Sequence, residues 1–171
     1  MIQRLRVPLG FVIAAIVLWL ASPTGLTILA GLPIALAGAA FRAMAAGVIR
    51  KDSRLATSGP YSWTRNPLYF GSFLMSAGFA VMSANWIAAC VLMLPSIFVY
   101  PSVIQSEEGH LRRLFPDEYR EYCARVPRFV PSFHRIERSF SLRQYIANRE
   151  YNTALGFAAT LAIFIVKWRL I

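Results

Sequence analysis

Five short polar blocks contain the side chains of this sequence that are best suited to binding or catalysis. They are Ser58–Tyr61, Arg65–Tyr69, Glu107–Glu108, Tyr119–Tyr122 and Arg125–Arg128. Carboxylates beside a guanidinium and an amide can hold a charged or hydrogen-bonding ligand, because together they offer both acceptors and donors. We therefore expect any chemistry of this chain to take place where these blocks meet.

Pro67 indicates how the second block is held. Proline suits the first turn of a helix, where its missing N–H leaves no hydrogen bond unmade. A helix that starts there places Asn66 at or near the N-cap and Tyr69 one turn inside. The paired acids end a different apolar run, so we expect them to reach this corner across a helical hairpin.

Other kinds of site find no support in the sequence. All eight acidic residues lie outside the apolar runs, so no carboxylate is placed at mid-membrane to carry a proton or a cation. There is no glycine-rich phosphate loop and no His-x-x-x-His pair. Cys90 and Cys123 lie far apart in dissimilar segments, which supports neither a disulfide framework nor a metal site. We expect no metal.

The composition indicates a membrane protein. Hydrophobic residues make up 57% of the 171 residues, charged residues only 15%, and the mean hydropathy is +0.50. A helix needs roughly 20 apolar residues to cross a bilayer, so a chain of this length has room for four or five spans and no separate soluble domain. The prediction is an all-α polytopic membrane bundle that forms one domain, 1–171.

Five apolar runs are the expected membrane helices. They are Val7–Ala21, Leu26–Ile49, Leu68–Met82, Trp86–Ile104 and Thr153–Val166. The first is interpreted as an uncleaved signal anchor, since no small-x-small cleavage site follows it. Pro95 and Pro101 are expected to kink the fourth run. The last run is short, so a re-entrant or interfacial helix is an alternative there, and the polar segment 105–150 is expected to hold a short interfacial helix.

The positions of the cations predict the topology. All but Lys167 and Arg169 of the 18 Lys and Arg residues flank the same ends of the apolar runs. Short loops rich in such residues stay in the cytosol. We therefore expect an integral protein of the cell inner membrane, with its N-terminus and its polar blocks on the cytosolic face. The net charge of +10 then faces the membrane surface, and nucleic acid is not an expected partner.

The ordered blocks resemble a known family. The segments Thr57–Tyr61, Arg65–Gly71, Glu107–Phe115, Glu118–Tyr122 and Arg125–Arg128 are similar to those of the isoprenylcysteine carboxyl methyltransferases, and more distantly to those of phospholipid N-methyltransferases and membrane sterol reductases. The resemblance extends from about Leu55 to Pro131. It implies a membrane enzyme that binds S-adenosylmethionine in a cytosolic cavity, formed by about 53–131, and takes a lipophilic acceptor from the bilayer.

The resemblance also implies roles for individual residues. Those that match the cofactor pocket of the family are Leu55, Ala56, Tyr61, Asn66, Pro67, Leu68, Tyr69 and Glu107. The catalytic candidates are Arg65, Asn66, Glu108 and Arg128. Two positions depart from the family pattern: Asn66 stands where the family has histidine and cannot titrate near neutral pH, and Val103 stands where the eukaryotic enzymes have an arginine that faces the acceptor carboxylate. Arg128 or Arg149 could supply that charge.

Alternatives remain open at this point. The pocket could serve a sterol-type reductase that uses a nicotinamide, or the chain could be a membrane scaffold without activity. Taken singly, the paired acids could form a solvated helix end with Arg112 as ion-pair partner, Arg42 could snorkel to the interface, and Tyr119 and Tyr122 could be interfacial anchors. Gly31, Ala35, Gly38 and Ala39 are expected only to allow close helix packing. The sequence does not reveal the oligomeric state.

Overall fold

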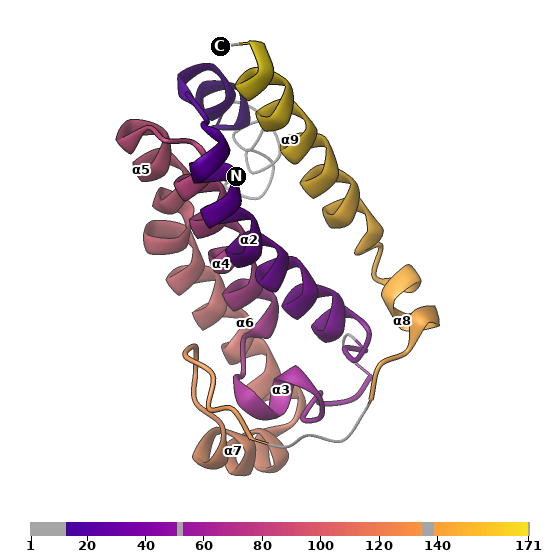
Figure 1. Ribbon diagram of the computed structural model, residues 1–171. Helices are drawn as coiled ribbons and strands as arrows, with labels where there is room; N and C mark the ends of the chain where they lie inside the picture. Colours follow the sequence, from indigo (N-terminus) through magenta and orange to yellow (C-terminus); the bar gives the residue numbers. More distant parts are fainter. Residues whose placement is uncertain (1–12, 51–52, 135–138, 171) are drawn as a thin grey trace.

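The computed structural model describes residues 13–50, 53–134 and 139–170, and all regular structure in these ranges is helical (Figure 1). Residues 13–20 form the first described helical segment. The elements that follow are α2 (Gly25–Ala46), α3 (Pro60–Trp63), α4 (Pro67–Met82), α5 (Trp86–Leu94), the π-helical turn η1 (Pro95–Val99), α6 (Tyr100–Leu114), α7 (Pro116–Arg125), α8 (Leu142–Ala147) and α9 (Tyr151–Leu170).

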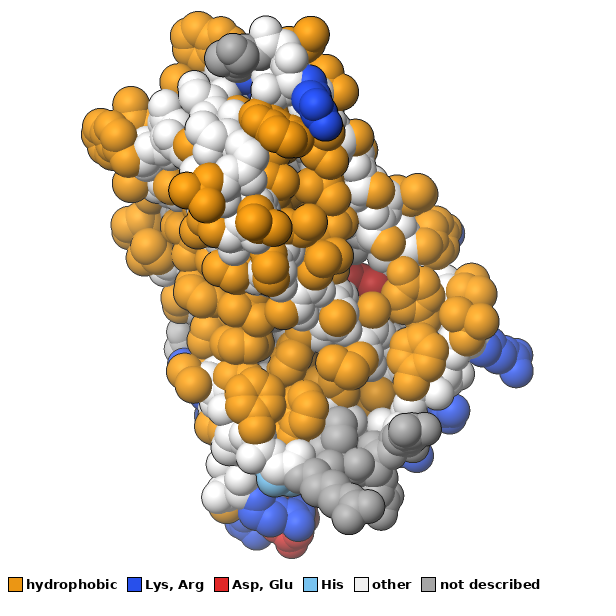
Figure 2. Space-filling view, in the orientation of Figure 1, with side chains coloured by type: hydrophobic (Ala, Val, Ile, Leu, Met, Phe, Trp, Pro, Cys, Tyr) orange, Lys and Arg blue, Asp and Glu red, His pale blue; other side chains and the backbone are white. Residues whose placement is uncertain are grey.

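The predicted membrane helical bundle is confirmed. By length and composition, α2, the continuous unit 86–114 and α9 can each cross a membrane, and α4 is a shorter apolar helix beside them. The first predicted run, 7–21, lies partly outside the described residues. Hydrophobic side chains cover most of the face in Figure 2, and most of the visible Lys and Arg side chains lie in its lower half, some over α7 and others on the side of α8; this lower half also contains α3 in Figure 1. We call this part the basic end.

Glycines bring α2 and α4 into close contact, as the sequence predicted. A Cβ atom added at Gly38 of α2 would lie 2.6 Å from the carbonyl oxygen of Gly71 in α4, and one at Gly78 would lie 2.7 Å from the carbonyl oxygen of Gly31. Backbone atoms cannot move aside as a side chain can, so larger residues would push the helices apart. The close approach at Gly71 fixes the start of α4, which carries Tyr69, against the second half of α2.

Replacing Gly78 by alanine is therefore expected to lower the free energy of unfolding by about 1 to 3 kcal/mol, the usual cost of overpacking. Thermal unfolding of the detergent-purified protein measures this. Gly156→Ala in α9 is the matched control, because nothing lies within 4 Å of an added Cβ there. Equal melting temperatures for the two variants would contradict the packing argument.

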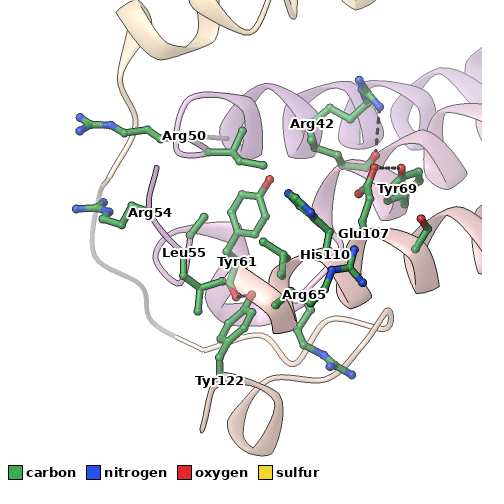
Figure 3. Close-up of a pocket in the computed structure, with 16 residues that line it drawn as sticks. Arg42, Arg50, Arg54, Leu55, Tyr61, Arg65, Tyr69, Glu107, His110 and Tyr122 are labelled. Atoms are coloured by element: carbon green, nitrogen blue, oxygen red, sulfur yellow. Dashed lines mark hydrogen bonds between the residues drawn. The ribbon is translucent and has the colours of Figure 1, made fainter. Parts of the chain in front are cut away.

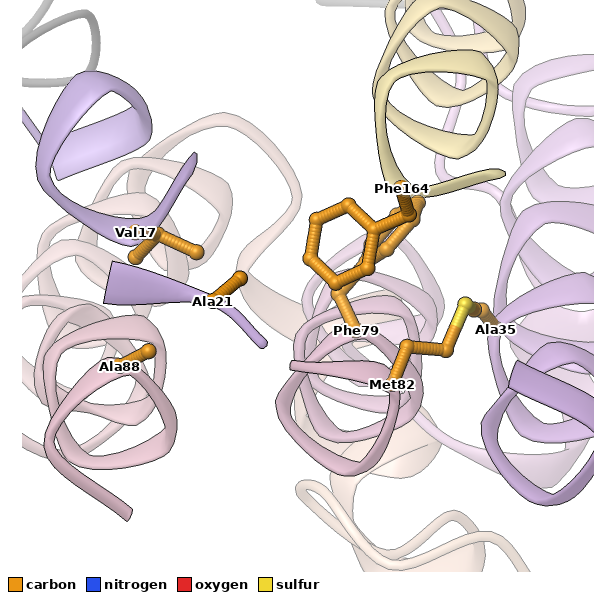
Figure 4. Close-up of a cluster of buried hydrophobic side chains, with 7 residues drawn as sticks. All are labelled: Val17, Ala21, Ala35, Phe79, Met82, Ala88 and Phe164. Atoms are coloured by element: carbon orange, nitrogen blue, oxygen red, sulfur yellow. The ribbon is translucent and has the colours of Figure 1, made fainter. Parts of the chain in front are cut away.

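The bundle core lies away from the basic end. Val17, Ala21, Ala35, Phe79, Met82, Ala88 and Phe164 form one buried cluster, to which α2, α4, α5 and α9 all contribute (Figure 4). Asn85 starts α5 by accepting a hydrogen bond from the N–H of Ala88 at 3.0 Å, as helix N-caps do. A separate apolar cluster of Leu55, Tyr119, Tyr122 and Val126 holds α7 in place at the basic end.

The fourth predicted run is longer than expected. One π-helical turn, Pro95–Val99, begins at the first proline, and Pro101 follows it directly in α6, where the helix continues without a break. The helix then continues past the predicted end at Ile104 to Leu114. The paired acids consequently project from the middle of a helix that extends beyond the apolar run.

The last helix is also longer than predicted. α9 has 20 residues, so by length and composition it can cross a membrane, and the interfacial alternative is not needed. Lys167, one of the two cations that the topology left on the far side, has a structural explanation. Its ammonium group donates hydrogen bonds to the carbonyl oxygens of Leu18 at 2.8 Å, Trp19 at 3.1 Å and Ala21. A cation at these otherwise unpaired carbonyls stabilises the end of the first described helix.

Candidate functional site

Four of the five polar blocks contribute side chains to one cavity at the basic end. Its volume is about 620 Å³, within the range of small-molecule sites. Side chains from the end of α2, the segment before α3, and α3, α4, α6 and α7 line it. Seven of the predicted site residues are among them: Leu55, Ala56, Tyr61, Arg65, Leu68, Tyr69 and Glu107.

A tight turn and a short helix place Tyr61 in this cavity. Gly59 has a φ of +59°, a left-handed conformation that glycine adopts without strain, and Pro60 begins α3 directly after it. Figure 3 shows Tyr61 in the middle of the lining side chains. Its hydroxyl is buried and has no hydrogen-bond partner among the described residues. Burial, and then the nearby Tyr122 and Glu107, raise the pKa of Tyr61, so the phenol stays protonated and can donate to a ligand.

Tyr69 and Glu107 form the polar side of the cavity. The Tyr69 hydroxyl donates a hydrogen bond of 2.7 Å to the Glu107 carboxylate, and this bond joins α4 to α6. The Tyr69 ring meets the ring of Tyr100 edge to face, with centroids 5.2 Å apart. The carboxylate is solvent-exposed and keeps acceptor capacity for a cation that enters the cavity.

The other acid of the pair has a different position. Glu108 is buried at 6% exposure, and its carboxylate lies 3.1 Å from Nε of Arg128 and 3.5 Å from Arg65. It also accepts a hydrogen bond of 3.3 Å from the side-chain amide of Asn66, which donates a second bond to the carbonyl oxygen of Arg128 at 2.9 Å. The alternative pairing with Arg112 is not what holds this carboxylate. Glu108 instead ties α6 to the start of α4 and to the segment after α7.

The predicted site residues thus divide into two groups. Asn66 is the N-cap residue of α4, as predicted, but its side chain makes no capping bond and turns to Glu108. Of the four catalytic candidates only Arg65 lines the cavity. The predicted residues outside the described cavity lining are Asn66, Pro67, Glu108, Arg128 and Arg149. Arg128 lines a small apolar pocket instead, beside Tyr100.

The two tyrosines of α7 are not interfacial anchors. Tyr119 and Tyr122 are 1% and 3% exposed, and the Tyr122 hydroxyl donates a hydrogen bond of 2.6 Å to the carbonyl oxygen of Tyr61. Burial raises the pKa of both hydroxyls. Burial lowers the pKa of Arg65, but Glu108, Cys123 and Tyr119 act in the opposite direction and the net shift is upward. On this side of the cavity the two phenols are therefore neutral and Arg65 is permanently charged.

Arg42 is the main lining residue that the sequence interpretation missed. It does not snorkel to the interface. Nε and Nη2 donate to both carboxylate oxygens of Glu150, at 2.7 Å and 3.0 Å, and Nη1 donates to the carbonyl oxygen of Leu68 at 3.2 Å and to Ser72. His110 was also missed, although its position three residues after Glu107 on one helix could have indicated a shared face.

Comparisons with known proteins agree with this arrangement. The model of the phospholipid methyltransferase family matches residues 38–118, which include most of the cavity lining. The protein-S-isoprenylcysteine O-methyltransferase of Schizosaccharomyces pombe is 30% identical over 95 residues, 56% of this chain and 40% of that protein. Over part of its length the chain is therefore similar to methyltransferases. The resemblance to the isoprenylcysteine carboxyl methyltransferase family is confirmed.

Two further relatives of this methyltransferase-like chain carry other names. The nickel-cobalt-cadmium resistance protein NccN of Alcaligenes xylosoxydans xylosoxydans is 40% identical over 93 residues, 53% of this chain and 43% of that protein. The cobalt-zinc-cadmium resistance protein CzcN of Cupriavidus metallidurans is 39% identical over 95 residues, 54% and 44% of the two chains. The matches span less than half the length of these relatives. No solved structure matches the chain significantly.

Proposed function

We propose that this chain transfers a methyl group from S-adenosylmethionine to a lipophilic acceptor at the cytosolic face of the inner membrane. The observation that carries the proposal is the convergence of Tyr61, Tyr69 and Glu107, which come from three separate helices, around one cavity at the basic end. These are the residues that the family resemblance assigns to the cofactor. The acceptor is an isoprenylcysteine carboxylate or another lipid.

The lining residues fit the methyl donor. Glu107 is an acceptor for its ammonium or ribose hydroxyl groups, and the unpartnered Tyr61 hydroxyl is a donor for a carboxylate or ring nitrogen. The faces of Tyr61, Tyr69 and Tyr122 suit a sulfonium cation, since a positive charge is attracted to an aromatic face. When bound, S-adenosylmethionine supplies a methyl group that its sulfonium has already activated.

The contribution of the chain is then positioning. Holding acceptor, methyl group and sulfur in line turns a bimolecular reaction into an effectively unimolecular one. The Glu108 cluster and the hydrogen bond from Tyr122 to the backbone of Tyr61 fix the walls of the cavity. Arg65 places a permanent positive charge at the lining, and Tyr61 keeps its proton at neutral pH. The apolar helices beside the cavity favour an acceptor that is dissolved in the bilayer.

The cytosolic placement rests on charge. The cavity lies at the end that carries most of the arginines, and membrane proteins keep such segments in the cytosol. S-adenosylmethionine is a cytosolic cofactor, so its site has to face that compartment. The names of the two metal-resistance relatives raise metal binding as another function. Among the described residues, however, no group of three or more His, Cys, Asp or Glu side chains is placed to hold an ion.

Equilibrium binding to the detergent-purified protein tests the proposal. We expect saturable binding of S-adenosylmethionine, which excess NADPH or NADH does not displace. Membranes from cells that overproduce the protein should contain lipids that have gained the mass of one CH₂ group. Binding of a nicotinamide cofactor at the same site would support the reductase instead, and no binding of either cofactor would overturn the proposed function.

A further inference from the structure

Glu150 lies outside the region that the family model matches, yet it contacts Arg42, which lines the cavity. It directly precedes α9 and is 8% exposed. The family model ends at residue 118, so it assigns Glu150 no role. Its carboxylate binds Arg42 with both oxygens, a bidentate geometry that fixes the guanidinium plane.

The guanidinium of Arg42 is saturated by partners within the protein. Besides the two bonds to Glu150, it donates to the carbonyl oxygen of Leu68, to the Ser72 hydroxyl, and to the Thr153 hydroxyl at 3.3 Å. These five bonds equal the number of N–H groups that arginine has. Arg42 lines the cavity, but it has no spare donor for a ligand as long as Glu150 holds it.

Removal of the Glu150 charge would leave the Arg42 guanidinium without its counter-ion. Figure 3 shows Arg42, Tyr69 and Glu107 grouped at the same side of the cavity. Glu107 is the only carboxylate among the described residues that line it. A partly buried arginine that has lost its counter-ion is attracted to the next available anion. That anion is the carboxylate that the proposed function assigns to the methyl donor.

We propose that Glu150 is a positioning residue of the methyl-donor site: it neutralises Arg42 and directs it away from Glu107, which keeps that carboxylate available for the ammonium group of the donor. This inference rests on the proposed function. It makes the segment at the start of α9 part of the site, although α9 itself contributes no described residue to the cavity lining.

Glu150→Gln is the test variant. It removes the charge and keeps the side-chain size, and we expect it to bind S-adenosylmethionine about tenfold more weakly, within the usual range of coupling between sites. The double variant R42Q/E150Q removes the stray cation as well and should bind within about threefold of the wild type, even if it melts at a lower temperature. Glu121→Gln is the matched control, because this carboxylate is exposed on α7 and should leave binding unchanged.

Two outcomes would overturn the inference. Wild-type affinity in Glu150→Gln would show that Arg42 does not compete for Glu107, and a double variant that binds no better than the single one would show that Glu150 only anchors α9. If Glu150→Gln does not fold, Glu150→Asp replaces it as the test variant, because it keeps the charge. Glu150→Asp should bind the donor within about threefold of the wild type. A loss of about tenfold in this variant would contradict the charge argument. If the wild type itself fails to bind S-adenosylmethionine, the proposed function fails instead.

Discussion

Replacing Glu107 by alanine is expected to weaken binding of S-adenosylmethionine by about tenfold or more. A hydrogen bond to a charged group contributes roughly 1.5 to 3 kcal/mol, and the lower part of that range applies because the Glu107 side chain is solvent-exposed. The change also removes the partner of the Tyr69 hydroxyl, which lies 2.7 Å from the carboxylate. Titration of the detergent-purified variant with the cofactor measures the affinity.

The control for this variant is Glu118→Ala, which removes an exposed carboxylate from α7, away from the cavity lining. It should bind the cofactor as the wild type does. The melting temperature of Glu107→Ala should stay close to that of the wild type, since an exposed side chain contributes little to stability. Unchanged affinity in Glu107→Ala would remove the main residue from the proposed cofactor site.

Replacing Glu108 by alanine is expected to lower the stability of the protein, whereas Glu107→Ala lowers mainly its affinity for the cofactor. The expected loss in the free energy of unfolding is about 3 kcal/mol. Removal of one partner from a buried ion pair leaves the other charge without compensation. That charge is Arg65, whose side chain is only 13% exposed. Asn66 and Arg128 also lose Glu108 as their interaction partner. Thermal or denaturant unfolding of the purified protein measures the loss, ideally with a probe near α7.

Glu108→Gln separates charge from shape in this cluster. It can still accept from the Asn66 amide but cannot neutralise Arg65, so its stability should lie between those of the wild type and Glu108→Ala. If Glu108→Ala unfolds as the wild type does, Glu108 is not the residue that holds the two segments together. A large loss of cofactor affinity without any loss of stability would return Glu108 to the catalytic role that the sequence suggested.

The sequence was most informative where a local pattern determines the structure. Small residues at helical spacing in α2 predicted close helix packing, and the structure shows that α4 is the partner. Pro67 predicted the start of α4, since proline is compatible with a first helical turn. The ordered polar blocks predicted the cavity, because the family resemblance already contained their arrangement in space.

Long-range pairing was not predictable in the same way. The ion pair of Arg42 with Glu150 joins residues 108 positions apart, and no local pattern indicates which of the eight acids an arginine will meet. The division of the paired acids was also missed. Adjacent residues on a helix point about 100° apart, so Glu107 and Glu108 can face different surroundings, and only Glu107 lines the cavity. The family resemblance assigned Glu107 to the cofactor pocket, but the residue pattern alone could not show that Glu108 is buried, because that depends on how α6 is rotated against α4.

Lys167 has a consequence for how this protein is made. Its ammonium group completes the end of a helical segment that is synthesised almost 150 residues earlier, by bonds to the carbonyl oxygens of Leu18, Trp19 and Ala21. Those oxygens lack this partner until α9 has left the ribosome and inserted. The earliest described helix therefore reaches its final hydrogen bonding only after α9 has been made and has packed against it.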